Sequence, residues 1–227
     1  MKIIKNEEEG MSGKDFTNRG RLLGKTAAVA LFCLGVIYVV TLGIGLLSLE
    51  SLSEPVGDPF FSLLEILILI MAPLMVVLMV EIHAFAPQNT KRLSLVALVF
   101  MSIMACITCS VHFLILTVSR QIQSLTGLPW VPLFFSFKWP SVVYALDILA
   151  WDFFFSLSVL FAAPVFKGDR KKTVVRIFMI ACGVLSFAGL MGPVTGNMQI
   201  RNIGIVGYAV VFPVTCLLLA GVFRRPE

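Results

Sequence analysis

The sequence predicts an all-α membrane protein, a bundle of six transmembrane helices with both termini on the inner side of the membrane. Apolar residues make up 58% of the 227 residues and charged residues only 14%, whereas soluble domains have about a quarter of their residues charged. Apolar runs of about twenty residues recur six times, and the basic residues concentrate on alternate connections between them. At this length the chain holds one bundle and no soluble domain.

Each apolar run is long enough to cross roughly 30 Å of hydrocarbon as a helix. The expected spans are about 26–49, 60–80, 93–118, 140–163, 174–194 and 203–223, so residues 26–225 form the transmembrane bundle. Pro73 and Pro213 fall inside the second and sixth spans, where neighbouring helices can compensate for a lost backbone donor. Residues 1–25 are polar, and we expect them to form a disordered cytoplasmic tail because they have little apolar surface to bury.

The basic residues predict the orientation of the bundle. With the N-terminus inside, the outer connections contain only Arg120, Lys138 and Arg201 of the 18 lysines and arginines. Inner connections of membrane proteins are enriched in these residues, so the pattern favours an N-in, C-in topology. The positive net charge then reflects topology and contact with lipid headgroups of the bilayer, and no nucleic-acid partner is expected. The absence of an Asn-x-Ser/Thr sequon fits a multi-pass protein of a prokaryotic plasma (cytoplasmic) membrane.

Four ionisable residues lie inside the spans. Glu65, His112 and Asp147 are about five to seven residues from the outer ends of the second, third and fourth spans, a depth of roughly 8 to 11 Å at 1.5 Å per residue. Asp152 is deeper, near the middle of the fourth span. A charged Asp at the centre of a membrane helix costs about 2.5 to 3.5 kcal/mol, so such groups face the protein interior. The shared depth predicts that Glu65, His112 and Asp147 meet in the outer half.

Helical spacing extends this set to two aromatic residues. Tyr144, Asp147 and Trp151 share one face of the fourth span, whereas Asp152, five residues after Asp147, should point about 140° away in an α-helix. Small or polar residues also align along the other spans. We expect these faces to line a cavity, whose candidate ligand- or proton-binding residues are Glu65, His112, Asp147, Asp152, Trp151 and Tyr144.

The second outer connection, residues 119–139, is rich in aromatic side chains and prolines. Its aromatic residues are Trp130, Phe134, Phe135, Phe137 and Trp139. Aromatic rings favour the membrane interface. The segment therefore forms either an aromatic belt in the outer interface or a lid over a cavity that opens outward.

Sequence motifs give no support for a metal or cofactor. One histidine and three carboxylates on separate helices could hold a divalent ion, but the Glu-x-x-His spacing of helical-bundle metal sites is absent. HExxH, GxSxG, P-loop and dinucleotide-binding motifs are also absent. The CxxC formed by Cys106 and Cys109 lies within a membrane span, where packed thiols are expected. We therefore expect no metal site and no cofactor.

Three functional hypotheses follow. The first is a binding protein or proton-coupled carrier for a small molecule or ion, with an outward-facing pocket in which protonation of Asp147 or His112 controls occupancy. The second is an intramembrane enzyme that acts on a lipid or isoprenoid with Asp147 and His112 as acid and base. The third is a structural or accessory membrane subunit whose polar residues only fix helix packing.

Overall fold

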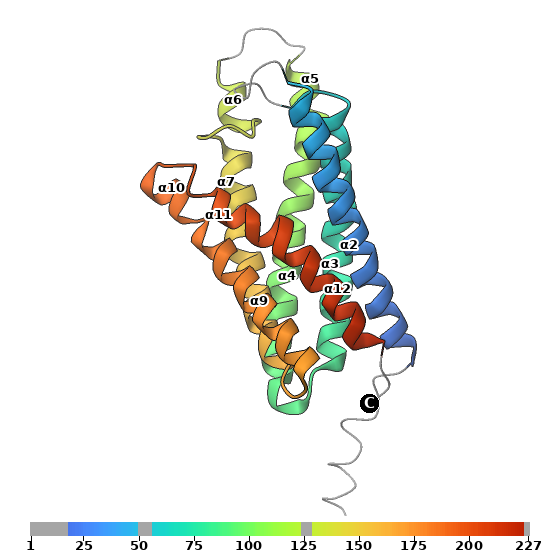
Figure 1. Cartoon of the computed structure of the whole chain (residues 1–227). Coiled ribbons are helices and arrows are strands. Elements are labelled where there is room, and N and C mark those ends of the chain that lie inside the picture. Colours follow the sequence, from blue (N-terminus) through green and yellow to red (C-terminus); the bar gives the residue numbers. More distant parts are fainter. Residues whose placement is uncertain (1–17, 50–55, 124–128, 225–227) are drawn as a thin grey trace, which may run out of the picture.

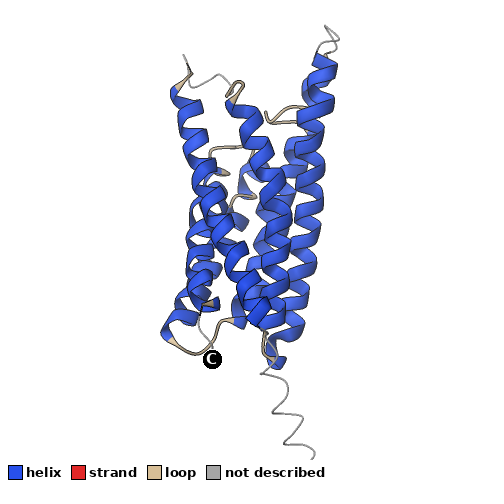
Figure 2. Cartoon of the chain, turned by 90° about the vertical axis from the view of Figure 1, so that its right-hand side faces the viewer, coloured by secondary structure: helices blue, strands red, loops and turns tan. Residues whose placement is uncertain are grey.

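The computed structural model describes residues 18–49, 56–123 and 129–224, and regular structure within these ranges is helical, without a strand (Figure 2). Six helical segments there are long and apolar enough to cross a membrane. They span Asn18–Leu47, Phe60–Phe85, Gln88–Ile122, Val142–Val165, Arg170–Thr195 and Asn202–Phe223. The predicted all-α bundle of six membrane-spanning helices is therefore confirmed.

Several spans are built from more than one helical segment. The first two are single helices, α2 (Asn18–Leu47) and α3 (Phe60–Phe85). The third comprises η1 (Gln88–Thr90), α4 (Lys91–Leu114), η2 (Ile115–Ser119) and α5 (Arg120–Gln123). After α6 (Val131–Phe134), the fourth comprises α7 (Val142–Ile148), η3 (Leu149–Phe155), α8 (Ser156–Ala162) and η4 (Ala163–Val165). The fifth comprises α9 (Arg170–Ala188) and α10 (Met191–Thr195), and the sixth α11 (Asn202–Ile205), η5 (Val206–Val211) and α12 (Phe212–Phe223). The segments η2, η3 and η5 are π-helical.

The six spans form a closed ring in chain order (Figure 1). α3 packs between α2 and α4, α4 packs against η3 and α8, and α8 packs against α9. α9 then contacts η5 and α12, and α12 returns to α2. The start of α2 and the end of α12 lie at one end of the bundle, here called the terminal end. α5, α6 and α10 lie at the opposite end, here called the loop end.

Large apolar side chains fill the ring toward the terminal end. These fully buried residues include Met75, Leu78, Met79, Met101, Phe155, Phe166, Met179 and Leu219. A smaller cluster toward the loop end consists of Val111, Ile115 and Val143, with Phe61, Phe135 and Phe137 packed against it. The two clusters leave an unfilled part of the ring between them.

Three spans begin several residues earlier than predicted, and the third span begins at Gln88 instead of 93. α2 begins at Asn18, so residues 18–25 are helical rather than part of the expected tail, because Arg and Lys favour helices and extend their charges away from lipid. Residues 1–17 of that tail lie outside the described residues. α9 begins at Arg170 instead of 174, since the Asp169 side chain accepts a hydrogen bond from the Lys172 backbone N–H and caps the helix.

Candidate functional site

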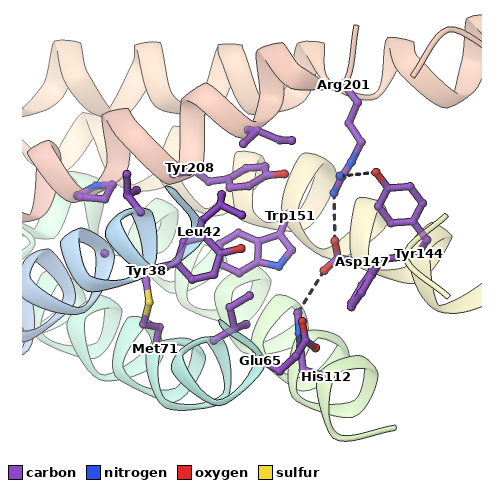
Figure 3. A pocket seen from close by; sticks show the side chains of 17 residues that line it. Tyr38, Leu42, Glu65, Met71, His112, Tyr144, Asp147, Trp151, Arg201 and Tyr208 are labelled. Carbon is purple, nitrogen blue, oxygen red and sulfur yellow. Dashed lines mark hydrogen bonds and ion pairs between the residues drawn. The ribbon is translucent and has the colours of Figure 1, made fainter. Parts of the chain in front are cut away.

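A cavity of about 310 Å³ lies inside the ring (Figure 3). Its lining residues come from five of the six spans and from the connection before α7. Ligand pockets in proteins have volumes of about 300 to 1,000 Å³, so this cavity fits a small molecule. One part of its wall carries charged side chains, and the remainder is aromatic and aliphatic.

Glu65 and His112 form the first contact in the charged wall. Nδ1 of His112 on α4 lies 2.7 Å from Oε2 of Glu65 on α3, and the two residues are 3% and 4% exposed. The contact that the shared depth predicted is therefore present. It directs the other ring nitrogen, Nε2, toward Asp147 of α7, whose Oδ1 lies 3.5 Å away.

The Arg201 guanidinium contacts three side chains of the fourth span: Asp147, Tyr144 and Asp152. Its Nη2 donates a hydrogen bond to Oδ2 of Asp147 at 3.1 Å, and its Nη1 donates to the Tyr144 hydroxyl at 2.9 Å. Its Nε lies 3.4 Å from Oδ2 of Asp152. Although Arg201 precedes α11 and was expected in an outer connection, it is only 5% exposed.

The sequence pattern predicts Arg201 only as a topology signal, and Arg201 was not predicted as a site residue. A signal was nevertheless present: Asp147 and Asp152 lie inside one span, and buried carboxylates need a cationic partner. Arg201 directly precedes the sixth span and is the basic residue nearest to it on the outer side. The pairing could have been inferred from this excess of acid in one span and the isolated base beside another.

Asp152 does not line the cavity, as its position five residues after Asp147 predicts, but its carboxylate still contacts Arg201. Both carboxylates reach Arg201, because residues 149–155 form the π-helix η3 rather than an α-helix. A π-helix has hydrogen bonds between residues five apart, so such residues return to nearly the same side. The carboxylates of Asp147 and Asp152 therefore contact the same guanidinium from successive turns of the fourth span.

The charged wall belongs to a continuous chain of charged groups that runs from Glu65 through His112, Asp147 and Arg201 to Asp152, which itself does not line the cavity. Several atoms of these groups have no hydrogen-bond partner among the described residues. These atoms are Nε2 of His112, Oδ1 of Asp147, both carboxylate oxygens of Asp152 and Nε of Arg201. Arg201 Nε lies 3.4 Å from Asp152 Oδ2, and His112 Nε2 lies 3.5 Å from Asp147 Oδ1. Both distances are longer than a good hydrogen bond, so these contacts are ion pairs whose atoms can still donate or accept hydrogen bonds.

The remainder of the cavity is aromatic and aliphatic. Trp151 on η3 and Tyr208 on η5 lie with ring centroids 5.0 Å apart, and Tyr38 on α2 lines the same space (Figure 3). Leu42 and Met71 add aliphatic surface. Two π-helical segments thus present aromatic rings to the cavity, and π-helical turns are frequent at functional sites.

Phe137 brings the connection before α7, predicted to be an outer one, to the cavity. Its ring lies 5.5 Å from the His112 ring and 6.0 Å from the Tyr144 ring, and it lines the cavity. Trp130 and Phe134 of the same connection remain 43% and 46% exposed, as an interfacial belt would be. The connection therefore contributes Phe137 to the cavity lining and leaves other aromatic residues exposed; residues 124–128 lie outside the described ranges.

In the part of the chain that the structure describes, no three or more His, Cys, Asp or Glu side chains are grouped as a metal site would require. The cation at the centre of the acidic cluster is Arg201. Comparison with protein-family models, curated proteins and solved structures gave no match to this chain.

Proposed function

We propose that this polytopic membrane protein binds a small molecule in the cavity and couples that binding to a proton on His112, as a proton-coupled carrier does. One observation carries the proposal: Nε2 of His112 and Oδ1 of Asp147 face each other at 3.5 Å in the cavity wall, and neither has a hydrogen-bond partner among the described residues. Intramembrane ionisable groups mark ligand and proton pathways, and histidine changes charge near neutral pH.

The distribution of basic residues supports an orientation for this carrier. It favours a cytoplasmic terminal end, which would place the loop end and the cavity in the outer half of a prokaryotic plasma membrane. In that orientation Phe137, which lines the cavity, belongs to an outer connection.

A specific observation also favours an enzyme as a second candidate. Glu65 binds Nδ1 of His112 and thereby orients the ring, while Nε2 is left unpaired toward the cavity. This is the arrangement of a general base with an orienting carboxylate. A structural subunit is less well supported, because polar residues that only fix packing would leave no cavity beside them.

Ligand-dependent stability tests the proposed function, because a molecule that binds the folded state raises its Tm. The probes are 2-phenylethylamine, 2-phenylethanol and phenylacetate, with hexylamine, hexanol and hexanoate as a second skeleton. We expect at least one probe to raise the Tm of the purified protein in detergent, with a different shift at pH 6 and pH 8. The pH difference should vanish in His112→Gln. Mass spectrometry of the recovered probe separates a carrier, which leaves it unchanged, from an enzyme.

Two alanine-to-phenylalanine variants control for non-specific effects. Ala209 lines the cavity, so Ala209→Phe should fill it and abolish the shift. Ala181 of α9 is exposed on the outside of the bundle, so Ala181→Phe should retain it. The proposal is overturned if no probe stabilises the wild type, or if Ala209→Phe responds as the wild type does.

A further inference from the structure

We propose that the ligand is a small amphipathic ammonium ion, the charged form of a primary or secondary amine, and that it enters in exchange for the proton on His112. The inference rests on the proposed function, because it names the class of molecule for the same cavity. Charge balance, the unpaired atoms of the wall, and the aromatic lining support it independently.

The charge balance favours a cation. Glu65 and Asp147 line the cavity, and Arg201 is the permanent cation among the described lining residues. A proton on His112 balances the second carboxylate, and loss of that proton leaves a negative charge in excess. Asp152, paired with the same guanidinium, adds a further acidic group. An ammonium ion can therefore replace the proton without leaving a buried charge uncompensated.

The unpaired atoms fit an amine in particular. When the neutral His112 ring carries its hydrogen on Nδ1 and donates a hydrogen bond to Glu65, Nε2 is a bare acceptor that faces the Oδ1 acceptor of Asp147 at 3.5 Å. Two acceptors at this distance repel each other unless a donor is shared between them. An ammonium group with at least two N–H bonds can donate to both atoms, whereas an alcohol has one donor and a carboxylate has none.

The cavity beside these atoms fits the organic part of such a cation. The faces of aromatic rings attract cations, and the Arg201 guanidinium already lies 4.6 Å from the centre of the Tyr144 ring. Tyr38, Trp151 and Tyr208 line the rest of the space, together with aliphatic side chains (Figure 3). One end is therefore acidic and the body apolar, which is the complement of an amphipathic amine.

An anionic ligand is disfavoured by the state of Arg201. Its guanidinium already contacts Asp147, Asp152 and Tyr144. A ligand carboxylate would have to displace one of these partners and leave a buried Asp without its cation, which is unfavourable.

Titratable or charged groups from the neighbouring spans surround His112. These groups are Tyr38 of α2, Glu65 of α3, Tyr144 and Asp147 of α7, Tyr208 of η5, and the Arg201–Asp152 pair. Glu65 and Asp147 are the two carboxylates within 3.5 Å of its ring nitrogens. Binding of an ammonium ion beside them competes with the His112 proton, so amine affinity should rise with pH.

Isothermal titration calorimetry of the full chain in detergent tests the exchange. The probes are 2-phenylethylamine, 2-phenylethanol and phenylacetate, which share one skeleton and differ in charge. We expect 2-phenylethylamine to bind at least about tenfold more tightly at pH 8 than either analogue, since unpaired buried polar groups reject ligands that lack the donor. Its affinity should rise with pH by up to about tenfold per unit, the limit for release of one proton. Titration in two buffers of different ionisation enthalpy should show about one proton released per amine.

Two glutamine variants provide the matched comparison. His112→Gln should bind the amine with an affinity independent of pH and without proton release. Glu81→Gln removes another buried carboxylate, 16 residues from Glu65 on α3 and outside the cavity lining, and should behave as the wild type. Proton release by the wild type decides the question even if His112→Gln fails to fold.

The outcomes separate this inference from the proposed function. If phenylacetate or 2-phenylethanol binds as tightly as the amine, the ligand class is wrong although the cavity still binds small molecules. If the amine binds without proton release, the exchange is wrong. If no probe binds and none shifts the Tm, the proposed function falls as well.

Discussion

Nε of Arg201 lies 3.4 Å from Oδ2 of Asp152, a residue with no exposure to solvent in the middle of the fourth span. The same guanidinium binds Asp147 at 3.1 Å. The two residues therefore connect the start of the sixth span to the deepest acid of the fourth. This contact joins Arg201 of the cavity wall to a buried acid outside the cavity lining, and its loss should affect stability as well as ligand binding.

Arg201→Gln should lower the free energy of unfolding by about 3 to 5 kcal/mol, because two buried carboxylates lose their cation. Unfolding in mixed detergent followed by circular dichroism measures the change. Lys138→Ala is the control, since Lys138 is an exposed basic residue of the same predicted outer side. Combining Arg201→Gln with Asp152→Asn should recover part of the loss through direct coupling. Strict additivity in this cycle would contradict the ion pair.

Gly207→Ala should destabilise the contact between η5 and α9 by about 1 to 3 kcal/mol. A Cβ at Gly207 would lie 2.8 Å from the Ser186 backbone nitrogen and 2.9 Å from the Cys182 carbonyl oxygen, so backbone would have to move. Gly43→Ala is the matched control, because its Cβ would meet nothing within 4 Å. The same unfolding measurement should find Gly43→Ala neutral or slightly stabilised. Equal effects of the two changes would argue against the close packing.

Ser158→Ala should lower the unfolding free energy by about 0.6 kcal/mol, and by no more than about 1.7 kcal/mol. The Ser158 hydroxyl donates a 2.7 Å hydrogen bond to the Ala97 carbonyl of α4, and the two residues are fully buried. Ser102→Ala serves as control, since that hydroxyl bonds only within its own helix to Leu98 and is exposed. Greater loss in Ser102→Ala than in Ser158→Ala would show that this contact does not join the fourth span to α4.

Asp58, at the loop end, should make a pH-dependent contribution to the stability of the folded protein. Its carboxylate accepts hydrogen bonds from the Ser62 hydroxyl, the Ser62 backbone N–H and Arg120. The Ser62 hydroxyl contact is the main cause that lowers the pKa of Asp58, and the Ser62 N–H and the Arg120 charge lower it further. A lowered folded-state pKa stabilises the protein above the unfolded value of about 3.9, and the effect disappears as pH falls through the folded value.

Asp58→Asn should therefore be less stable than the wild type at pH 6, by less than about 1 kcal/mol because the Arg120 pair is exposed. As the pH falls through the lowered folded-state pKa of Asp58, the stabilities of the two proteins should converge, which thermal unfolding over a series of decreasing pH values measures. A stability difference that grows toward acid pH would reverse the predicted sign.

The orientation of the bundle can be tested with topology reporters. A cytoplasm-dependent reporter fused after Arg225 should be active, and one inserted near Gly127 should be inactive, because basic residues concentrate on the predicted inner side. An export-dependent reporter at the same two positions should give the opposite pattern. Reversed activities would place the cavity in the inner half of the membrane.

The sequence by itself determined the class of fold and the number of spans, since apolar length alone identifies a helix that can cross a bilayer. It also identified Glu65, His112 and Asp147 as neighbours, because residues at one depth on adjacent helices have few other partners. The contact between Glu65 and His112 followed from that one-dimensional argument.

Only the tertiary structure decided the role of Arg201 and the direction of Asp152. Residue spacing assumes a regular α-helix, and the π-helical turn of residues 149–155 has a smaller rotation per residue, which brings Asp152 closer to the side of Asp147. Hydropathy likewise assigns Arg201 to a connection, because the residue lies outside the apolar runs of the sequence. A hydropathy pattern does not reveal whether the side chain of such a residue turns into the bundle. The closed ring of six spans places that side chain against the buried acids, and three-dimensional packing alone sets such contacts between distant parts of a chain.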